Sequence, residues 1–107
     1  MLNITKNVND AELNIALEGR LDTISSPQLE AELQESLTPS VTSLVFDLEK
    51  LQYCSSAGLR VLLTAQKIMN KQGTMVLRNT SSDIKEIFDV TGFSDVLTIE
   101  SGKTARF

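Results

Sequence analysis

Tyr53-Cys54-Ser55-Ser56-Ala57-Gly58-Leu59-Arg60 joins the two most strongly patterned segments of the chain. A largely apolar run ends just before it, and the clearest helical pattern, Leu59 to Met69, starts inside it. Serine favours the start of a helix because its side-chain oxygen accepts a hydrogen bond from a first-turn N–H that lacks a partner. The same end of a helix carries partial positive charge and attracts anions. These residues predict a strand, a turn and a helix, with Ser55 and Ser56 as the first candidate functional residues.

The residues before this turn predict three strands. Residues 2–5 alternate in polarity and indicate a short first strand, and residues 12–17 alternate in the same way. Because a few turn-forming residues separate the two segments, we expect them to pair as a β-hairpin. Leu44-Val45-Phe46 is a short, continuous apolar run, which is typical of a strand that is covered on both faces.

A helix is expected between the second and third strands. Ser26 and Pro27 predict its start, with Ser26 at the capping position and Pro27 at the first helical position. Three leucines then recur every four residues and share one face of the helix: Leu29, Leu33 and Leu37. Pro39 is expected to end the helix, because proline lacks the N–H that a further helical turn needs.

The residues after the serine turn predict two more helices and a strand. The helix from Leu59 to Met69 is expected to end before Gly73, which suits the position just past a helix. Met75-Val76-Leu77 then forms a short buried strand. Asp83 and Glu86 have the spacing of a capping box and predict the start of the third helix.

The chain is expected to close with a short strand and a tail. Gly92 ends the third helix, Val96 to Ile99 form the last strand, and residues 101–107 form a flexible tail. Alternating strands and helices imply a largely parallel sheet. The predicted fold class is therefore α/β. We expect a single domain over residues 1–107, with a mixed sheet of four to five strands, an antiparallel edge hairpin and about three main helices.

Composition excludes several classes of function. The 107 residues include no histidine, which removes His-based acid–base catalysis, His-containing triads and His metal ligands. A net charge of -4 opposes broad binding to nucleic acid, and no apolar run is long enough to span a membrane. One cysteine and a start without a signal-peptide pattern fit a cytoplasmic protein. We therefore expect no catalytic residue, no metal and no cofactor.

The pattern alone leaves the role of the two serines open. They could only cap the helix, or one hydroxyl could also accept a phosphate, which adds about -1.5 to -2 charge at pH 7. The Gly-x-Ser-x-Gly pattern of hydrolases fails, because Cys54 stands two residues before Ser56. Asp22 follows the second strand and is expected at the same edge of the sheet, where ligands gather in open α/β folds. Its alternative role is to form an Asx-type turn.

Five stretches, in this order and spacing, resemble the STAS domain of bacterial anti-sigma factor antagonists over nearly the whole chain. They are Gly19-Arg20-Leu21-Asp22, Leu44-Val45-Phe46-Asp47-Leu48, Ser55-Ser56-Ala57-Gly58-Leu59, Gly73-Thr74-Met75-Val76-Leu77 and Ile87-Phe88-Asp89-Val90-Thr91-Gly92-Phe93. The family pattern at the helix start is commonly Asp-Ser-Ser/Thr-Gly-Leu. Aligned on Gly58-Leu59, the phosphate acceptor falls on Ser56, while Ser55 replaces the family's Asp and Ala57 its second hydroxyl residue.

The resemblance implies a regulatory role. Such proteins bind an anti-sigma factor that is also a serine kinase, and so release a sigma factor. Phosphorylation at the helix start breaks the complex, and a phosphatase restores it. The implied phosphorylation site is Ser56, with Ser55 as second choice. The implied partner-binding residues are Asp22, Thr23, Ser55, Ser56, Ala57 and Gly58. ATP and magnesium belong to the kinase, so this chain needs neither.

Two alternatives stay open beside this reading of the sequence. The chain could be a STAS interaction module of another signalling complex that is never phosphorylated. From a different class, it could be a small-ligand or nucleotide-binding module that uses the same helix start.

Overall fold

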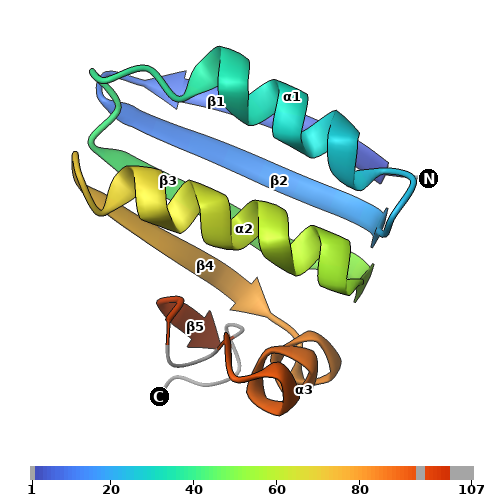
Figure 1. The fold of residues 1–107 in the computed structure, drawn as a ribbon. Coiled ribbons are helices and arrows are strands. Elements are labelled where there is room, and N and C mark those ends of the chain that lie inside the picture. The colour runs from blue at the N-terminus through green and yellow to red at the C-terminus, as the bar shows by residue number, and fades with distance from the viewer. Residues whose placement is uncertain (1, 94–95, 102–107) are drawn as a thin grey trace.

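The computed structural model describes residues 2–93 and 96–101, which form five strands and three helices. In chain order these are β1 (Leu2–Asn9), β2 (Glu12–Leu21), α1 (Ser26–Ser36), β3 (Ser43–Cys54), α2 (Ser56–Met69), β4 (Thr74–Thr80), α3 (Ser82–Thr91) and β5 (Ile99–Ser101). The strands form one sheet in the order β1-β2-β3-β4-β5, in which only β1 runs antiparallel to its neighbour (Figure 1). The predicted α/β class, the mixed sheet and the antiparallel edge hairpin are confirmed. Beyond Ser101, the predicted tail lies outside the described residues.

Two helices cover one face of the sheet. α1 and α2 lie side by side, α1 over the hairpin and α2 over β3 and β4, while α3 lies beyond the carboxyl end of β4 (Figure 1). Along β2, Leu13, Ile15 and Leu17 are buried, whereas Ala16 and Glu18, on the opposite face, are exposed. Each buried leucine or isoleucine stabilises the fold by roughly 1.5–3 kcal/mol relative to its exposed state. None of the helices in the described part of the chain is long and apolar enough to cross a bilayer.

The first hairpin is longer than predicted. β1 extends to Asn9 and pairs with β2 without interruption, although residues 7–9 were expected to belong to the turn. The turn itself consists of Asp10 and Ala11, and Asp10 has a φ of 56°. Aspartate tolerates this left-handed backbone better than most residues, so the chain can reverse in two residues.

β3 is also much longer than the apolar run that predicts it. It spans Ser43–Cys54, and its pairing with β2 shifts register twice, at bulges near Gly19 (φ 106°). Because of the bulges, Leu48, Leu51 and Cys54 all reach the core at a spacing of three residues. Strict alternation would direct Leu51 to the opposite face of the sheet. The expected cover on both faces holds at Val45, which is 5% exposed, but not further along the strand.

The predicted start of α1 is wrong by one residue. Ser25 is the N-cap, Ser26 is the first helical residue and Pro27 the second. The shift arises because Ser25 already has a helix-like backbone (φ -91°, ψ -16°), and its hydroxyl bonds to Arg20 at the end of β2 and to Asp22 instead of to the helix. The helix ends at Ser36, ahead of Pro39 as expected, with its leucines facing the core.

The start of α3 corrects the predicted capping box. Ser81, rather than Asp83, is the N-cap, and its side chain accepts a hydrogen bond of 3.2 Å from the N–H of Ile84. Asp83 instead lies in the first turn, where its charge favours the positive end of the helix. Gly92 closes the helix in the left-handed conformation, with a φ of 82°, as predicted.

Two further predictions, for Gly73 and for the last strand, differ from the structure. α2 ends at Met69, before Gly73 as expected, but its C-cap is Asn70, so Gly73 is not the residue just past the helix. A Cβ on Gly73 would lie 1.9 Å from the carbonyl oxygen of Thr42, so the close approach of two backbones requires glycine. The last strand starts at Ile99 instead of Val96. The N–H groups of Val96 and Leu97 bond to the carbonyl of Phe93, which leaves them unable to pair with β4.

Candidate functional site

The two serines at the start of α2 differ in their hydrogen bonds. Ser55 has an extended backbone (φ -84°, ψ 173°), and its hydroxyl oxygen accepts a hydrogen bond of 3.2 Å from the N–H of Gly58. Ser56 is the first helical residue and is exposed. Its hydroxyl makes no hydrogen bond with any of the described residues. Because Ser55 supplies the cap, the Ser56 hydroxyl remains available for chemistry.

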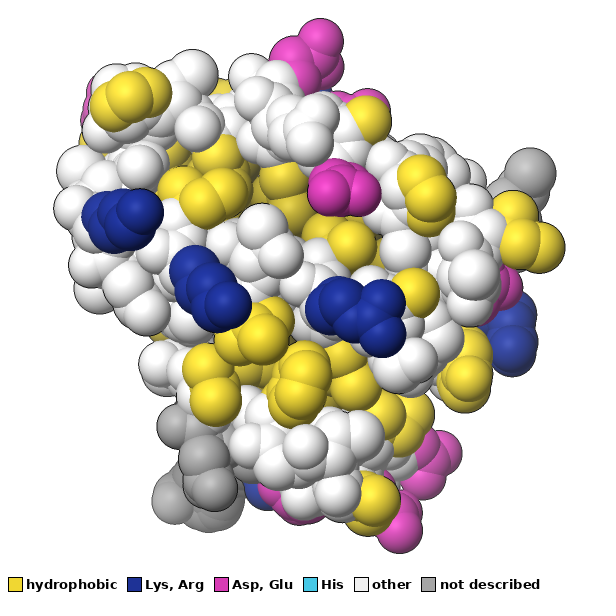
Figure 2. All heavy atoms as spheres, in the orientation of Figure 1, with side chains coloured by type: hydrophobic (Ala, Val, Ile, Leu, Met, Phe, Trp, Pro, Cys, Tyr) yellow, Lys and Arg dark blue, Asp and Glu magenta, His cyan; other side chains and the backbone are white. Residues whose placement is uncertain are grey.

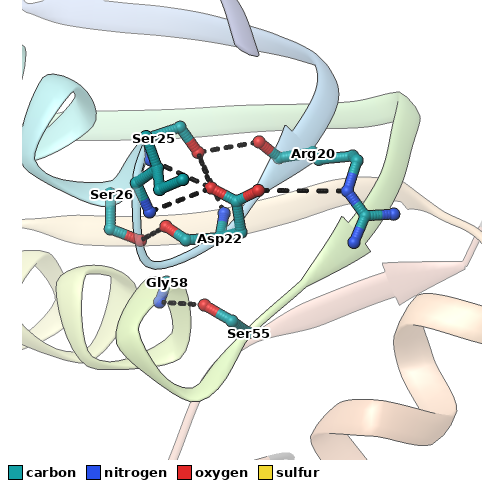
Figure 3. Close-up of polar contacts among 7 residues, drawn as sticks. Arg20, Asp22, Ser25, Ser26, Ser55 and Gly58 are labelled. Atoms are coloured by element: carbon teal, nitrogen blue, oxygen red, sulfur yellow. Dashed lines mark hydrogen bonds and ion pairs between the residues drawn. The ribbon is translucent and has the colours of Figure 1, made fainter. Parts of the chain in front are cut away.

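The β2–α1 loop forms a turn closed by the carboxylate of Asp22. Its Oδ1 accepts hydrogen bonds from the backbone N–H of Ile24 (3.1 Å) and of Ser25 (3.0 Å), as Figure 3 shows. These bonds, that of Ser25 first, lower the pKa of the Asp22 carboxyl, because they favour the charged form. Asp22 therefore forms the Asx-type turn that the sequence allowed.

Two buried serines at the start of α1 hold this loop in place through hydrogen bonds. The Ser25 hydroxyl donates to the carbonyl of Arg20 at 2.8 Å and accepts from the N–H of Asp22 at 2.9 Å (Figure 3). The Ser26 hydroxyl donates to the carbonyl of Asp22. From the sequence, Ser26 was expected only at the start of α1, and Ser25 had no role beyond the same segment. Their spacing from Asp22, three and four residues, was the signal that they also hold the loop.

Direct contacts join the loop to the start of α2. The N–H of Ser55 donates to the carbonyl of Leu21 at 2.8 Å, where the carboxyl ends of β2 and β3 pair. A Cβ on Gly58 would lie 2.6 Å from Cγ of Leu21, well inside normal contact. Glycine is therefore needed for the first turn of α2 to pack this closely against β2. The expected meeting of the Asp22 loop and the serine turn at one edge is confirmed.

A shallow hollow opens between the starts of α1 and α2. Its volume is about 240 Å³, and it is lined by Thr23, Ser26, Pro27, Glu30, Ala57, Arg60, Val61 and Thr64. On the face that carries the two helices, basic side chains form a row over α2 (Figure 2). Arg60 and Lys67 are the exposed cations of that helix. Glu30 and Arg60 are the only charged residues of the lining.

Known proteins share this architecture and its sequence pattern. A sequence profile of the STAS domain matches residues 3–104. The chain belongs to the STAS domain family. BtrV of Bordetella bronchiseptica is 33% identical over 105 residues, which span 97% of this chain and 90% of BtrV. The anti-sigma-B factor antagonist of Bacillus subtilis is 33% identical over 101 residues, which span 94% of this chain and 90% of that protein.

Solved structures have the same STAS fold. The anti-sigma factor antagonist SpoIIAA in its unphosphorylated form has a TM-score of 0.74 at 20% identity, covering 95% of this chain and 91% of SpoIIAA. SpoIIAA of Bacillus in its phosphorylated form has a TM-score of 0.72 at 21% identity, covering 96% of both chains. At this level of identity the likeness concerns the fold.

The residues predicted to bind a partner lie near one another at this edge of the STAS domain, in different surroundings. They are Asp22, Thr23, Ser55, Ser56, Ala57 and Gly58. Thr23 and Ala57 line the hollow, and Ser56 is exposed beside it. Asp22 and Ser55 are half-buried because they hold the two turns, and Gly58 is buried. Thr23, Ser56 and Ala57 therefore contribute to the accessible surface, whereas Asp22, Ser55 and Gly58 hold the turns beneath it.

An aromatic–cation contact at the same edge was not predicted from the sequence. The Arg20 guanidinium lies over the ring of Tyr53, with 4.4 Å between Cζ and the ring centre. Its Nε lies 3.9 Å from Oδ2 of Asp22. Such contacts are typically worth about 0.5–1 kcal/mol when exposed. The pairing depends on the bulged register that sets Arg20 opposite Tyr53, and this register is not visible in the sequence pattern.

The sole cysteine, Cys54, is not available as a nucleophile at the site. Cys54 is 2% exposed, and burial raises the pKa of its thiol to about 12, so the reactive thiolate is absent at neutral pH. Within residues 2–93 and 96–101, no group of three or more acidic or cysteine side chains is arranged to hold a metal ion.

Proposed function

We propose that this protein is an anti-sigma factor antagonist. It binds a kinase-type anti-sigma factor through the β2–α1 loop and the start of α2, and thereby releases a sigma factor. Phosphorylation of Ser56 by that partner ends the interaction, and a phosphatase reverses the modification. Family membership, the similarity to the anti-sigma-B factor antagonist of Bacillus subtilis and the phosphorylated form of SpoIIAA support this proposal.

The observation that carries the proposal is the unequal use of the two serines. Ser55 is engaged as the N-cap through its bond to the N–H of Gly58, whereas Ser56 is exposed and free of hydrogen bonds to the described residues. A kinase needs an accessible hydroxyl whose oxygen can attack the γ-phosphorus of ATP while ADP leaves and the proton passes to a base of the kinase. Ser56 meets this requirement better than Ser55, which is half-buried and bonded to Gly58, and this supports Ser56 as the acceptor.

The proposed switch works by adding negative charge to a surface that otherwise presents a neutral hydroxyl to the partner. A phosphate on Ser56 brings about -1.5 to -2 charge to an edge where Asp22 is already ionised. A partner that packs against this edge must then desolvate the phosphate or meet it with like charge, which costs several kcal/mol. Binding is therefore expected to fail through electrostatics and bulk, without unfolding of α2.

The direct test is phosphate mapping. The anti-sigma factor that co-purifies with this protein is mixed with it and with ATP and magnesium, and the phosphorylated residue is mapped by mass spectrometry. We expect one phosphate on Ser56, none in Ser56→Ala, and undiminished modification in Ser82→Ala, which removes the matching serine of α3. Absence of phosphate from both Ser55 and Ser56 would rule out the switch.

The binding half of the proposal has its own test. Affinity for the same partner is measured by calorimetry for the unmodified protein, Ser56→Asp and Ser82→Asp. We expect Ser56→Asp to weaken binding at least about tenfold, roughly 1.4 kcal/mol, and Ser82→Asp to leave it unchanged. Equal affinities of Ser56→Asp and the unmodified protein would favour the second candidate, a STAS interaction module without phosphorylation. The replacement of the family's Asp by Ser55 and of its second hydroxyl residue by Ala57 is the observation behind that candidate.

A further inference from the structure

An arginine stands one helical turn after the proposed phosphate acceptor. Ser56 is the first residue of α2 and Arg60 is the fifth, and both are exposed. Residues four apart on a helix lie on the same face, with about 5–6 Å between their Cβ atoms. Side chains on a helix also lean toward its N-terminus, so we expect the Arg60 side chain to reach back toward the first turn. An acidic group placed before a basic one at this spacing is the favourable order.

Among the described residues, no side chain competes for the guanidinium of Arg60 in the unmodified protein. Arg60 forms no ion pair with any of the described residues, although Glu30 lines the same hollow. The first turn of α2 contains no acidic residue either. The other arginine near this edge, Arg20, lies over Tyr53 and beside Asp22. Arg60 is thus the cation that a new negative charge on Ser56 would meet first.

We propose that Arg60 is an internal counter-ion for a phosphate on Ser56, so that modification ties its guanidinium to the first turn of α2 and withdraws it from the hollow between α1 and α2. Guanidinium suits this role because its planar fork can donate two parallel hydrogen bonds to phosphate oxygens. The inference rests on the proposed function, since it assigns the response of the same site to its modification.

The pairing makes the switch act twice on the same surface. Phosphorylation adds negative charge at Ser56 and also removes the positive charge that Arg60 offers at the lining of the hollow. Glu30 is then the only charged side chain that the lining still presents to a partner. A partner surface that is complementary to Arg60 in the unmodified protein therefore loses its attraction at the moment when repulsion appears.

The test measures the phosphate itself. Phosphoserine is placed at position 56 of the full chain by genetic code expansion, which needs no kinase, and the second ionisation of the phosphate is followed by ³¹P NMR in low salt. A counter-ion favours the dianion, so we expect the phosphate pKa to be lower by about 0.3 pH units with Arg60 than in Arg60→Gln. The difference should shrink at high salt, because the pair is exposed to solvent.

Two matched variants separate this pairing from general charge effects. Arg60→Lys keeps the charge and should retain most of the shift, whereas Lys67→Gln removes an exposed cation two turns further along α2 and should not change the phosphate pKa. Positions 56, 60 and 67 are all exposed, and circular dichroism checks that each variant is folded. Equal phosphate pKa values in the parent and Arg60→Gln, or an equal change in Lys67→Gln, would overturn the proposal.

The outcome is independent of the kinase experiment. If the partner fails to phosphorylate Ser56 but the pKa difference is found, the proposed function fails and the pairing stands. If the partner phosphorylates Ser56 but the phosphate pKa is the same with and without Arg60, the switch stands and the proposed role of Arg60 as counter-ion is wrong.

Discussion

α2 and α3 begin in the same way but in different surroundings. Ser55 and Ser81 each accept a hydrogen bond of 3.2 Å from the N–H three residues later, and each is followed by an exposed serine at the first helical position. The first turn of α3 contains Asp83, however, whereas the first turn of α2 contains no acidic residue. The favourable place for a negative charge is thus already filled in α3 and still open in α2.

The neighbouring elements differ as well. The start of α2 is bonded to β2 through the carbonyl of Leu21 and lies beside the Asp22 turn. At the third helical position, α2 has Gly58 pressed against Leu21, where α3 has the buried side chain of Ile84. A serine cap therefore marks where a helix starts, whereas the packing around the first turn decides which side chains are exposed there.

The largest effect is expected at the third position of α3. Ile84 is 1% exposed, and Ile84→Ala should lower the free energy of unfolding by about 2–4 kcal/mol, because it removes buried methyl groups and leaves a cavity. Urea denaturation with a fixed slope measures the change. A loss below about 1 kcal/mol would mean that α3 contributes little to the core.

The equivalent position of α2 should respond to the opposite change. Gly58→Val inserts a side chain whose Cβ would lie 2.6 Å from Cγ and 3.0 Å from the carbonyl oxygen of Leu21. We expect a loss of about 1–3 kcal/mol, since α2 must move away from β2 to relieve the overlap. The same urea measurement applies, and Gly92→Val is a poor control because Gly92 has a positive φ. Unchanged stability would contradict the close packing of these two elements.

The two caps should be nearly equal. Ser55→Ala and Ser81→Ala each remove one capping bond of 3.2 Å, and each should cost about 1 kcal/mol. The exposed serines beside them make no cap, so Ser56→Ala and Ser82→Ala should change stability by less than about 0.5 kcal/mol. Thermal denaturation of the four variants in parallel tests this pattern, which fails if Ser56→Ala is as costly as Ser55→Ala.

The smallest expected effect is a pH dependence of the free energy of unfolding that arises from Asp22, in the β2–α1 loop. The Asp22 pKa lies below the ordinary value of 3.8, chiefly because of the Ser25 N–H, so the bonded carboxylate stabilises the folded state above that pH. The advantage of the parent over Asp22→Asn should therefore be present at pH 6 and disappear as the pH falls below 3.8. Urea titrations at several pH values measure it; a constant difference across this range would show that the charge of Asp22 is irrelevant.

Local rules were sufficient for much of this fold. The alternation along β2, the leucine spacing of α1 and the apolar stripe of α2 follow from periodicity, and their order implied the parallel sheet. The helix start at Ser55 and Ser56 was likewise visible, because capping depends on neighbouring residues alone. The edge shared by the Asp22 loop and the serine turn followed from the direction of parallel strands.

What the sequence did not reveal depends on contacts between distant residues. The bulges of β3 are set by its pairing with β2, so neither its full length nor the contact of Arg20 with Tyr53 could be predicted from alternation. At α3, serine and aspartate compete for the cap, and only the backbone geometry decides for Ser81. Gly73 has a suitable position for a helix end, but its reason is the nearby backbone of Thr42.

Burial of the Cys54 thiol also makes the protein convenient for spectroscopy. Cys54 is the sole cysteine of the chain, and its thiol, with a pKa of about 12, stays protonated while the fold is intact. Maleimide reagents attack thiolates, so they should pass over this residue in the folded state. A cysteine introduced on the surface, for example Thr64→Cys at the lining of the hollow, could then carry a single fluorophore without prior removal of the native cysteine. The wild-type chain is in effect ready for site-specific labelling.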